Sequence, residues 1–254
     1  MPVAIVTGGA QGLGAAVCQL LLEQDYKVCI ADIEECKGEQ LLEELKTKFG
    51  SESVIFSSCD VSREEDFERT FRKTIDKFLS IDVLINNAGI VMEQNPRKLI
   101  DVNLIGPIFG CQLAIKYMSK TNGGKGGVVI NTSSILGFVP YSALPSYVAS
   151  KHALIGLTRS FGLPYHFSRD GITFSALCPS LMKTNILKSM NENSLTQNFD
   201  VSGFEEALLE PEYVAKGVLK IFEDRINGST LVVTKRKGFV YIGVQEELKD
   251  IPVE

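Results

Sequence analysis

The sequence lacks the residues that a metal centre or a nucleic-acid interface requires. It holds only two histidines, His152 and His166, and neither has cysteines or carboxylates at ligand spacing. The net charge is −5 and the calculated pI is about 5.3, whereas nucleic-acid-binding domains present a basic surface. We therefore expect neither a metal nor a nucleic acid as a partner.

Long hydrophobic runs and paired cysteines are also missing. There is no run of about 18 apolar residues, and the first residues enter a strand-like segment directly, so we expect no membrane span and no signal peptide. Cysteines in a C-x-x-C pair do not occur. Scattered cysteines in a chain of this size indicate reduced thiols and predict a cytoplasmic protein. The six cysteines are Cys18, Cys29, Cys36, Cys59, Cys111 and Cys178.

Short apolar segments alternate with longer segments of helical period. Strands are expected at residues 3–7, 27–32, 54–60, 83–85, 127–132, 172–178 and 230–234, with helices at 12–24, 34–49, 63–79 and 98–118 and another from about 145. Apolar strands that are each followed by a helix indicate a parallel sheet covered on both faces. We predict an α/β class: a doubly wound Rossmann sheet of about seven strands, in one catalytic domain over residues 1–254.

One long segment, residues 181–206, is expected to be irregular. It mixes Met182, Ile186, Leu187 and Met190 with many polar residues. Long irregular segments inside a compact domain often serve function. We interpret this segment as a flap over a ligand site.

A glycine-rich turn joins the first expected strand to the first helix, at residues 7–14. Its pattern is G-x-x-x-G-x-G, which differs from the common G-x-G-x-x-G fingerprint. Glycines allow a tight turn and close approach to a pyrophosphate at a helix N-terminus. We therefore predict a dinucleotide site that includes Gly8, Gln11, Gly12, Leu13 and Gly14.

Asp32 ends the second expected strand, 18 residues after Gly14. A carboxylate at this place accepts hydrogen bonds from the adenosine ribose and repels a 2′-phosphate. Neither Gln11 nor Ile33 offers a cation, so NAD is favoured over NADP as the cofactor. Asp32 and Glu35 also have capping-box spacing, and this structural interpretation is compatible with the functional one.

Tyr147 and Lys151 are four residues apart, which places both on one face of a helix. A free tyrosine titrates near ~10 and is a poor base at neutral pH. A nearby ammonium favours the phenolate and lowers that pKa. The spacing is common by chance, and by itself it is typical of a solvated helix face.

Several motifs follow one another along the chain, at residues 7–14, 60–61, 86–89, Asn103, 133–134, Tyr147 with Lys151, and 179–184. They stand in the order found in the short-chain dehydrogenase/reductase family, and the chain resembles that family over nearly its whole length. The resemblance implies that Ser134 polarises the substrate oxygen and that Tyr147 is the general acid/base. It further implies that Lys151 lowers the pKa of the tyrosine and binds the nicotinamide ribose, and that Asn103 anchors a proton-relaying water.

The same resemblance implies further cofactor contacts. Asp60 and Val61 would contact the adenine, and Asn87 would contact the adenosine ribose region. Thr184 and the backbone near Met182 would hold the carboxamide. The implied cofactor set also includes Ile33, Ala88, Gly89, Pro179, Tyr147 and Lys151.

Structural alternatives remain open for several of these residues. Asn103 could fill a helix defect, and residues 86–89 could chiefly end a strand. Ser133 competes with Ser134, although the spacing of thirteen residues before Tyr147 favours Ser134. His152 is interpreted as a packed or capping residue.

Two positions depart from the family pattern. Ser180 follows Pro179 where the family usually has glycine, which would alter the loop near the nicotinamide. Pro164 lies inside what would be a long active-site helix. Because proline removes a backbone donor and clashes with the carbonyl four residues earlier, we predict a kink or an early end there.

Within the family, the chain most resembles NAD-dependent 15-hydroxyprostaglandin dehydrogenases, at residues 117–120, 122–124, 126–127 and 147–152. Those enzymes have a glutamine where Leu144 stands, so we place Leu144 with Ser134 and Tyr147 in the substrate pocket. Phe138 and Tyr141 add to an apolar lining. We expect NAD-dependent, reversible oxidation of a secondary alcohol on a lipophilic substrate, and a homo-oligomer by resemblance.

Other functions remain open. One is a general alcohol, steroid or terpenoid dehydrogenase, or a carbonyl reductase. A second, non-enzymatic alternative is a former dehydrogenase that now only binds a nucleotide or lipid. The presence of Ser134, Tyr147, Lys151 and Asn103 together argues against that binding role.

Overall fold

The computed structural model describes residues 1–196 and 207–243. The strands are β1 (Val3–Thr7), β2 (Lys27–Asp32), β3 (Val54–Ser58), β4 (Val83–Asn86), β5 (Gly127–Thr132), β6 (Ile172–Pro179), β7 (Thr230–Thr234) and β8 (Gly238–Tyr241). The α-helices are α1 (Gly12–Glu23), α2 (Glu35–Phe49), α3 (Glu64–Phe78), α4 (Pro96–Ile100), α5 (Gly106–Met118), α6 (Pro145–Phe161), α7 (Pro164–Asp170), α8 (Asn185–Asn193) and α9 (Pro211–Asp224).

The described strands form one eight-stranded sheet in the order β3-β2-β1-β4-β5-β6-β7-β8. Neighbours from β3 to β7 pair in parallel, and β8 pairs antiparallel with β7. The predicted doubly wound fold is confirmed, but the expected seven strands omit β8. That strand has four residues and follows β7 after a short turn with no helix between them, so the alternation of strands and helices does not reveal it.

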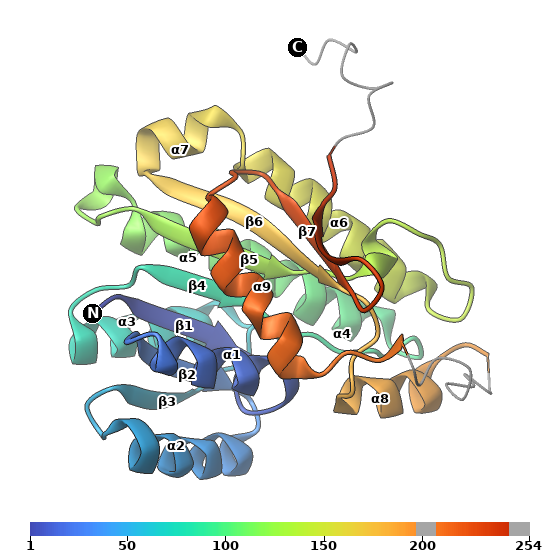
Figure 1. The fold of residues 1–254 in the computed structure, drawn as a ribbon, viewed down its shortest axis with the longest axis horizontal. Coiled ribbons are helices and arrows are strands. Elements are labelled where there is room, and N and C mark those ends of the chain that lie inside the picture. The colour runs from blue at the N-terminus through green and yellow to red at the C-terminus, as the bar shows by residue number, and fades with distance from the viewer. Residues whose placement is uncertain (197–206, 244–254) are drawn as a thin grey trace.

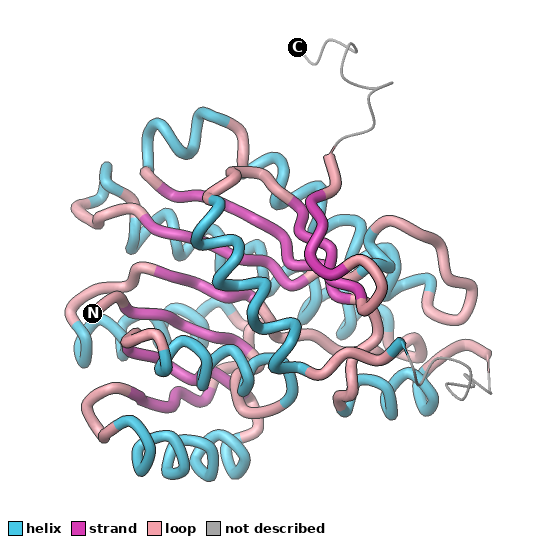
Figure 2. The backbone as a smooth tube through the Cα atoms, in the orientation of Figure 1, coloured by secondary structure: helices cyan, strands magenta, loops and turns pink. Residues whose placement is uncertain are grey.

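Helices cover both faces of the sheet. In Figure 1, α1, α2 and α9 lie in front of the strands and α3, α5 and α6 lie behind, and Figure 2 shows the strands as the middle layer. In front, Leu21, Leu42 and Val218 pack in one hydrophobic cluster with the sheet. Behind it, Phe71 and Met118 belong to a second cluster. Because both faces are covered, a ligand reaches the sheet at the ends of its strands.

The helix expected at residues 98–118 is interrupted. A π-helical turn at Asp101–Ile105 separates α4 from α5. Among the described helices, the combined stretch Pro96–Met118 alone is long and apolar enough to cross a membrane by length and composition. Cys111 and Met118 from this stretch are fully buried in the cluster behind the sheet, as the side chains of a core helix are.

The active-site helix ends before Pro164, as its sequence predicts. α6 stops at Phe161, Leu163 is extended with a ψ of 153°, and Pro164 begins the separate helix α7. At the first position of a helix, the missing N–H of proline costs nothing. The predicted early end of the helix is therefore confirmed.

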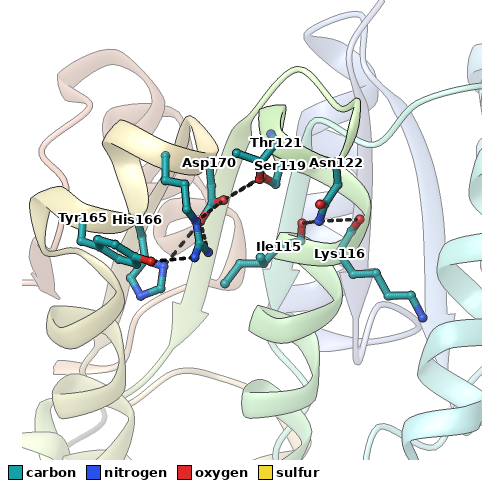
Figure 3. A network of polar contacts seen from close by, with 9 residues as sticks. Ile115, Lys116, Ser119, Thr121, Asn122, Tyr165, His166 and Asp170 are labelled. Carbon is teal, nitrogen blue, oxygen red and sulfur yellow. Dashed lines mark hydrogen bonds and ion pairs between the residues drawn. The ribbon is translucent and has the colours of Figure 1, made fainter.

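A buried carboxylate anchors α7 to the end of α5 (Figure 3). Asp170 is fully buried and accepts hydrogen bonds from Ser119 Oγ at 2.7 Å, from Thr121 Oγ1 at 3.2 Å, and twice from the Arg169 guanidinium. His166 Nδ1 lies 3.5 Å from the carboxylate. The Arg169 hydrogen bonds are the largest of the influences that lower the pKa of Asp170 to about 2. This network lies at the opposite end of the sheet from α8 and belongs to the scaffold (Figure 1).

The segment expected to be irregular contains a helix. α8 lies beyond the carboxyl ends of the strands (Figure 1), and residues 197–206 of the expected flap lie outside the described residues. Ile186, Leu187 and Met190 pack in a third hydrophobic cluster that includes Tyr147. The apolar residues of this segment therefore reach the region of the predicted catalytic tyrosine.

Candidate active site

A cavity of about 760 Å³ opens at the carboxyl ends of the strands. It lies where the order of the strands reverses, because β1 is flanked by β2 on one side and β4 on the other. Loops that follow β1, β2, β3, β4, β5 and β6 all contribute to its wall. Doubly wound sheets bind their ligands at this position.

The glycine turn forms one wall of the cavity. Gly8 has a φ of +61°, and a Cβ on Gly14 would stand only 2.0 Å from the Gly8 carbonyl oxygen. α1 begins at Gly12 without a side-chain cap from the described residues. Its first amide N–H groups therefore remain available for an anion. Gly8, Gln11, Gly12 and Leu13 line the cavity, whereas Gly14 packs behind the turn.

Asp32 lines the cavity at the end of β2 with 6% of its surface exposed. Its Oδ2 accepts a hydrogen bond from Ala10 N at 2.9 Å, and its Oδ1 accepts one from Glu34 N at 3.0 Å. The capping-box interpretation is wrong, because α2 begins at Glu35 and its N-cap residue is Glu34. The carboxylate instead joins the glycine turn to the end of β2.

Ser134, Tyr147 and Lys151 all line the cavity. The Lys151 ammonium lies 5.4 Å from the centre of the Tyr147 ring and donates a hydrogen bond to the Thr132 carbonyl at 2.8 Å. Ser134 lies close enough to Tyr147 to lower the pKa of its phenol, and its Oγ accepts a hydrogen bond from Leu136 N at 3.1 Å. Ser133 instead donates to the Lys151 carbonyl at 2.8 Å. Of the two serines, Ser134 is therefore the one that meets the phenol.

Burial is the largest influence on both titrating groups of the pair. It raises the pKa of Tyr147 to about 12, while the hydrogen bond from Ser134 acts in the opposite direction. It lowers the pKa of the Lys151 ammonium to about 8. Burial disfavours the charged form of each group. In this arrangement the lysine stands beside the ring, but the pKa of the phenol is not shifted towards neutrality.

Asn103 lies in the π-helical turn and is fully buried. Its Oδ1 accepts a hydrogen bond from Ile90 N at 2.8 Å, and its Nδ2 donates to the Ile90 carbonyl at 2.9 Å and to Ser150 Oγ at 3.3 Å. The side chain thus joins the widened turn to the loop after β4, which agrees with the structural alternative. Its role as a water anchor stays a prediction.

The loop after β6 closes another side of the cavity. Pro179, Ser180, Met182 and Thr184 line it, and Ser180 N donates to the Val233 carbonyl at 2.9 Å. The hydroxyl of Thr184 is buried and has no hydrogen-bond partner among the residues that the structure describes. A buried hydroxyl without a partner is costly, so this oxygen is suited to bind a ligand group.

The remaining predicted cofactor residues also reach the cavity. Asn87 has a structural role as well, because its Nδ2 donates to the Thr7 and Gly8 carbonyls at 2.9 and 3.1 Å. Asn86 is buried and donates to Asn131 Oδ1, which agrees with the structural interpretation of this strand end. The cavity-lining residues of this group are Ile33, Asp60, Val61, Asn87, Ala88 and Gly89.

Some sequence-predicted residues lie elsewhere. Leu144 is fully buried in the third hydrophobic cluster, with Leu99 and Met190, and is not part of the described cavity wall. Its expected contact with substrate is therefore not supported. Phe138 packs in a separate cluster with Ile155. His152 is exposed, with Nδ1 2.9 Å from the Val148 carbonyl oxygen on its own helix.

The sequence interpretation missed several apolar wall residues. Ile90 and Val91 follow β4, Leu136 follows β5, and Val102 lies in the π-helical turn. Ile90, Val91 and Leu136 could have been found from their place in the loops that follow strands whose carboxyl ends meet at the site. Thr132 was also missed, and its buried hydroxyl lacks a partner within the described chain.

The described residues contain no group of three or more histidine, cysteine, aspartate or glutamate side chains that could hold a metal ion. The charged residues around the cavity are instead dispersed. The positively charged residues that line the cavity are Lys98 and Lys151, and the negatively charged ones are Asp32, Glu34 and Asp60.

Comparisons with known proteins agree with this geometry. The family model described as short chain dehydrogenase matches residues 2–195. The 15-hydroxyprostaglandin dehydrogenases [NAD(+)] of Homo sapiens and Macaca fascicularis are each 37% identical over 244 residues, which cover 93% of this chain and 92% of those proteins. Carbonyl reductase family member 4 of Xenopus tropicalis is 32% identical, over 91% of this chain and 95% of that protein.

A solved structure shares the fold. It is a short chain dehydrogenase/reductase from Burkholderia phymatum in complex with NAD, and it matches with a TM-score of 0.78 at 20% identity. The match covers 91% of this chain and 88% of that one. At this level of identity, the likeness supports the fold alone.

Proposed function

This chain belongs to the short-chain dehydrogenase family, and from that membership we propose that it oxidises a secondary alcohol on a lipophilic molecule to the ketone, with NAD as the cofactor. One observation carries the proposal. Ser134, Tyr147 and Lys151 meet inside a single cavity whose other walls are the glycine turn and a set of apolar side chains.

The residues of the cavity fit NAD. The uncapped start of α1 suits a pyrophosphate, and the buried Asp32 disfavours the 2′-phosphate of NADP. The unpartnered Thr184 hydroxyl offers a hydrogen bond to the carboxamide. The 15-hydroxyprostaglandin dehydrogenases that resemble this chain carry NAD(+) in their names, which supports the same choice.

Each catalytic residue has one task in the proposed reaction. NAD, when bound, accepts the hydride from the alcohol carbon. Ser134 holds the alcohol oxygen, and the phenolate of Tyr147 takes its proton, so that the C–O bond becomes a carbonyl. Lys151, whose ammonium lies 5.4 Å from the centre of the Tyr147 ring, is proposed to favour that phenolate through its positive charge, against the burial that raises the pKa of the phenol in this structure. In reduction, the protonated Tyr147 returns the proton to the oxygen.

The apolar wall indicates the class of substrate. Leu136, Leu181, Ile186, Leu187 and Met190 line the cavity near α8. Such a wall favours a lipophilic alcohol and discriminates weakly between chain lengths, at roughly 1–3 kcal/mol per methylene. A prostaglandin-like alcohol heads the candidates because of the 37% identical relatives. Leu144, which stands where the resemblance leads one to expect a glutamine, lies outside the described cavity wall and therefore does not argue against this candidate.

A second candidate is carbonyl reduction, which the relationship to carbonyl reductase family member 4 supports. Burial raises the pKa of Tyr147 to about 12, so the phenol is protonated at neutral pH and ready to donate. The two candidates share one site and differ in direction. Because the chain has all four expected catalytic residues, a purely binding role is the weakest alternative. The four residues are Asn103, Ser134, Tyr147 and Lys151.

The test is NADH absorbance during incubation with NAD and a panel of lipophilic secondary alcohols, and with NADH and the matching ketones. We expect turnover in at least one series. Tyr147→Phe should reduce kcat by roughly 10²–10⁴-fold, because a general acid/base contributes that much, while NADH still binds in a fluorescence titration. NAD binding without turnover would support the binding role, and an active Tyr147→Phe variant would refute the mechanism.

Assembly and location complete the proposal. We propose a homo-oligomer, by family resemblance, and a cytoplasmic location. All six cysteines lie in the described residues and are free thiols, which supports a reducing compartment. Size-exclusion chromatography with light scattering would test the oligomeric state.

A further inference from the structure

The first turn of the catalytic helix α6 has no cap from its own sequence. The helix starts at Pro145 after Leu144, and leucine is a poor N-cap because its side chain accepts no hydrogen bond. Pro145 has no N–H, and Val148 N donates to the Leu144 carbonyl at 2.9 Å. The amides of Ser146 and Tyr147 are the two donors that still need partners.

Glu93, which lies in the loop after β4, satisfies both donors. Its Oε2 accepts from Ser146 N at 3.0 Å, and its Oε1 accepts from Tyr147 N at 2.9 Å. The residue is 5% exposed. A carboxylate at a helix N-terminus is stabilised by the helix dipole, and two bonds to one rigid group fix position as well as energy. One of these bonds ends on Tyr147, from which the phenol extends.

The same loop also holds the end of α8. Glu93 N donates to the Asn193 carbonyl at 3.1 Å, and Leu195 N donates to the Ala143 carbonyl at 3.0 Å. We call the meeting of residues 93–94, 143–147 and 193–195 the Glu93 junction. It connects the start of the catalytic helix with the helix whose Met190 lines the cavity.

We propose that Glu93 is a positioning residue, which keeps the first turn of α6, and with it the Tyr147 phenol, in fixed register with α8. Glu93 is not part of the described cavity wall, so it acts through Tyr147. A displacement of about 1 Å at a catalytic group can reduce a rate by roughly 10²-fold. The kinetic part of this inference rests on the proposed function, whereas its structural part does not need turnover.

The kinetic test compares Glu93→Ala and Glu93→Gln with Asn95→Ala in the full chain. Asn95 caps α4 from the same loop, through a 3.1 Å bond from Lys98 N, and is a matched control because this bond holds α4 and not the start of α6. We expect kcat to fall about 10–100-fold in Glu93→Ala and less in Glu93→Gln, which keeps one acceptor. The KM for NAD and the NADH affinity should change less than about twofold, and Asn95→Ala should keep its kcat.

Two results would overturn the kinetic inference. One is a kcat within about twofold of the Asn95→Ala value in both Glu93 variants. The other is a loss of kcat that only parallels a loss of NADH affinity and of thermal stability. Because Glu93→Gln preserves size and one hydrogen bond, it tests the inference even if Glu93→Ala does not fold.

Amide hydrogen exchange tests the junction without turnover. We expect faster exchange in Glu93→Gln than in the unaltered protein at Ser146 and Tyr147 and also at residues 193–195, with α4 unchanged. Faster exchange at Ser146 and Tyr147 alone would reduce Glu93 to a local cap and overturn the coupling. If the unaltered protein turns over no alcohol or ketone, the proposed function fails, and the exchange result still decides the junction.

Discussion

The buried hydroxyl of Thr184 offers a sharp test of the cofactor site. This oxygen has no hydrogen-bond partner among the described residues, although it lies at the wall of the cavity. Valine has the same shape as threonine without the hydroxyl. Thr184→Val should therefore stabilise the protein without cofactor, because it removes a desolvated group that costs about 1–3 kcal/mol.

The size of the expected stability change follows from the hydrogen bond that the Thr184 hydroxyl lacks. We take about 1 kcal/mol as the gain, which raises the Tm by roughly 2–4 °C in a chain of this size. With NAD the hydroxyl gains a partner, so the variant loses about 1 kcal/mol of binding and its Kd rises about fivefold. At 100 times the original Kd, NAD stabilises the unaltered protein by about 2.7 kcal/mol and the variant by about 1.8 kcal/mol. Saturating NAD should thus cancel the advantage of the variant.

The assay is thermal unfolding with and without NAD, together with an NADH fluorescence titration. Thr74→Val is a matched control, because the buried Thr74 hydroxyl donates to the Thr70 carbonyl at 2.8 Å in α3, away from the cavity. It should lower the Tm and leave the shift with NAD unchanged. A Thr184→Val variant that is destabilised without NAD, or that binds NADH as tightly as before, would refute the argument.

Three further substitutions test the scaffold and the glycine turn. Asp170→Asn should destabilise the protein at pH 7. The pKa of Asp170 falls from 3.8 to about 2 on folding, so its carboxylate contributes about 2 kcal/mol to the free energy of unfolding. This contribution is present above pH 4 and is lost as the pH falls through 2. Urea unfolding at pH 7 and at pH 2–3 checks this, and a difference that does not shrink in acid would contradict it. Gly14→Ala should abolish NADH binding and lower the Tm, because its Cβ would stand 2.0 Å from the Gly8 carbonyl oxygen. Gly156→Ala on α6, where no described atom lies within 4 Å of the new Cβ, should instead stabilise by about 0.5–1 kcal/mol.

Local patterns in the sequence were enough to predict most of the fold. Each parallel strand from β1 to β6 is a largely apolar segment before a helix, and Pro164 ends α6 for a steric reason that is visible in the sequence. β8 was missed because a short antiparallel edge strand breaks that alternation. The π-helical turn at Asp101–Ile105 was missed because one extra residue in a helical turn hardly changes an apolar pattern.

The site could be predicted where one short segment carries the chemistry. The glycine turn, Asp32 and the Tyr147–Lys151 pair are of this kind, and the structure brings them to one cavity. Contacts between segments that are distant in the sequence could not be predicted from such local motifs. The bond from Tyr147 N to Glu93 spans 54 residues, so the capping of α6 is visible only in three dimensions. The raised pKa of Tyr147 has the same origin, because burial is its largest cause and burial depends on the whole tertiary structure.

The π-helical turn also has a consequence for how the chain can change. A turn that holds an extra residue rotates the helix after it relative to the helix before it. Leu99, before the turn, faces the cluster around Tyr147, whereas Cys111 and Met118, after it, face the sheet. The helical stretch Pro96–Met118 thus packs against two hydrophobic clusters, with the side chains before and after the turn pointing in different directions around its axis. Removing one residue between 101 and 105 would turn one of these stripes away by roughly 100°, so the length of this turn is as constrained as the identity of any residue in it.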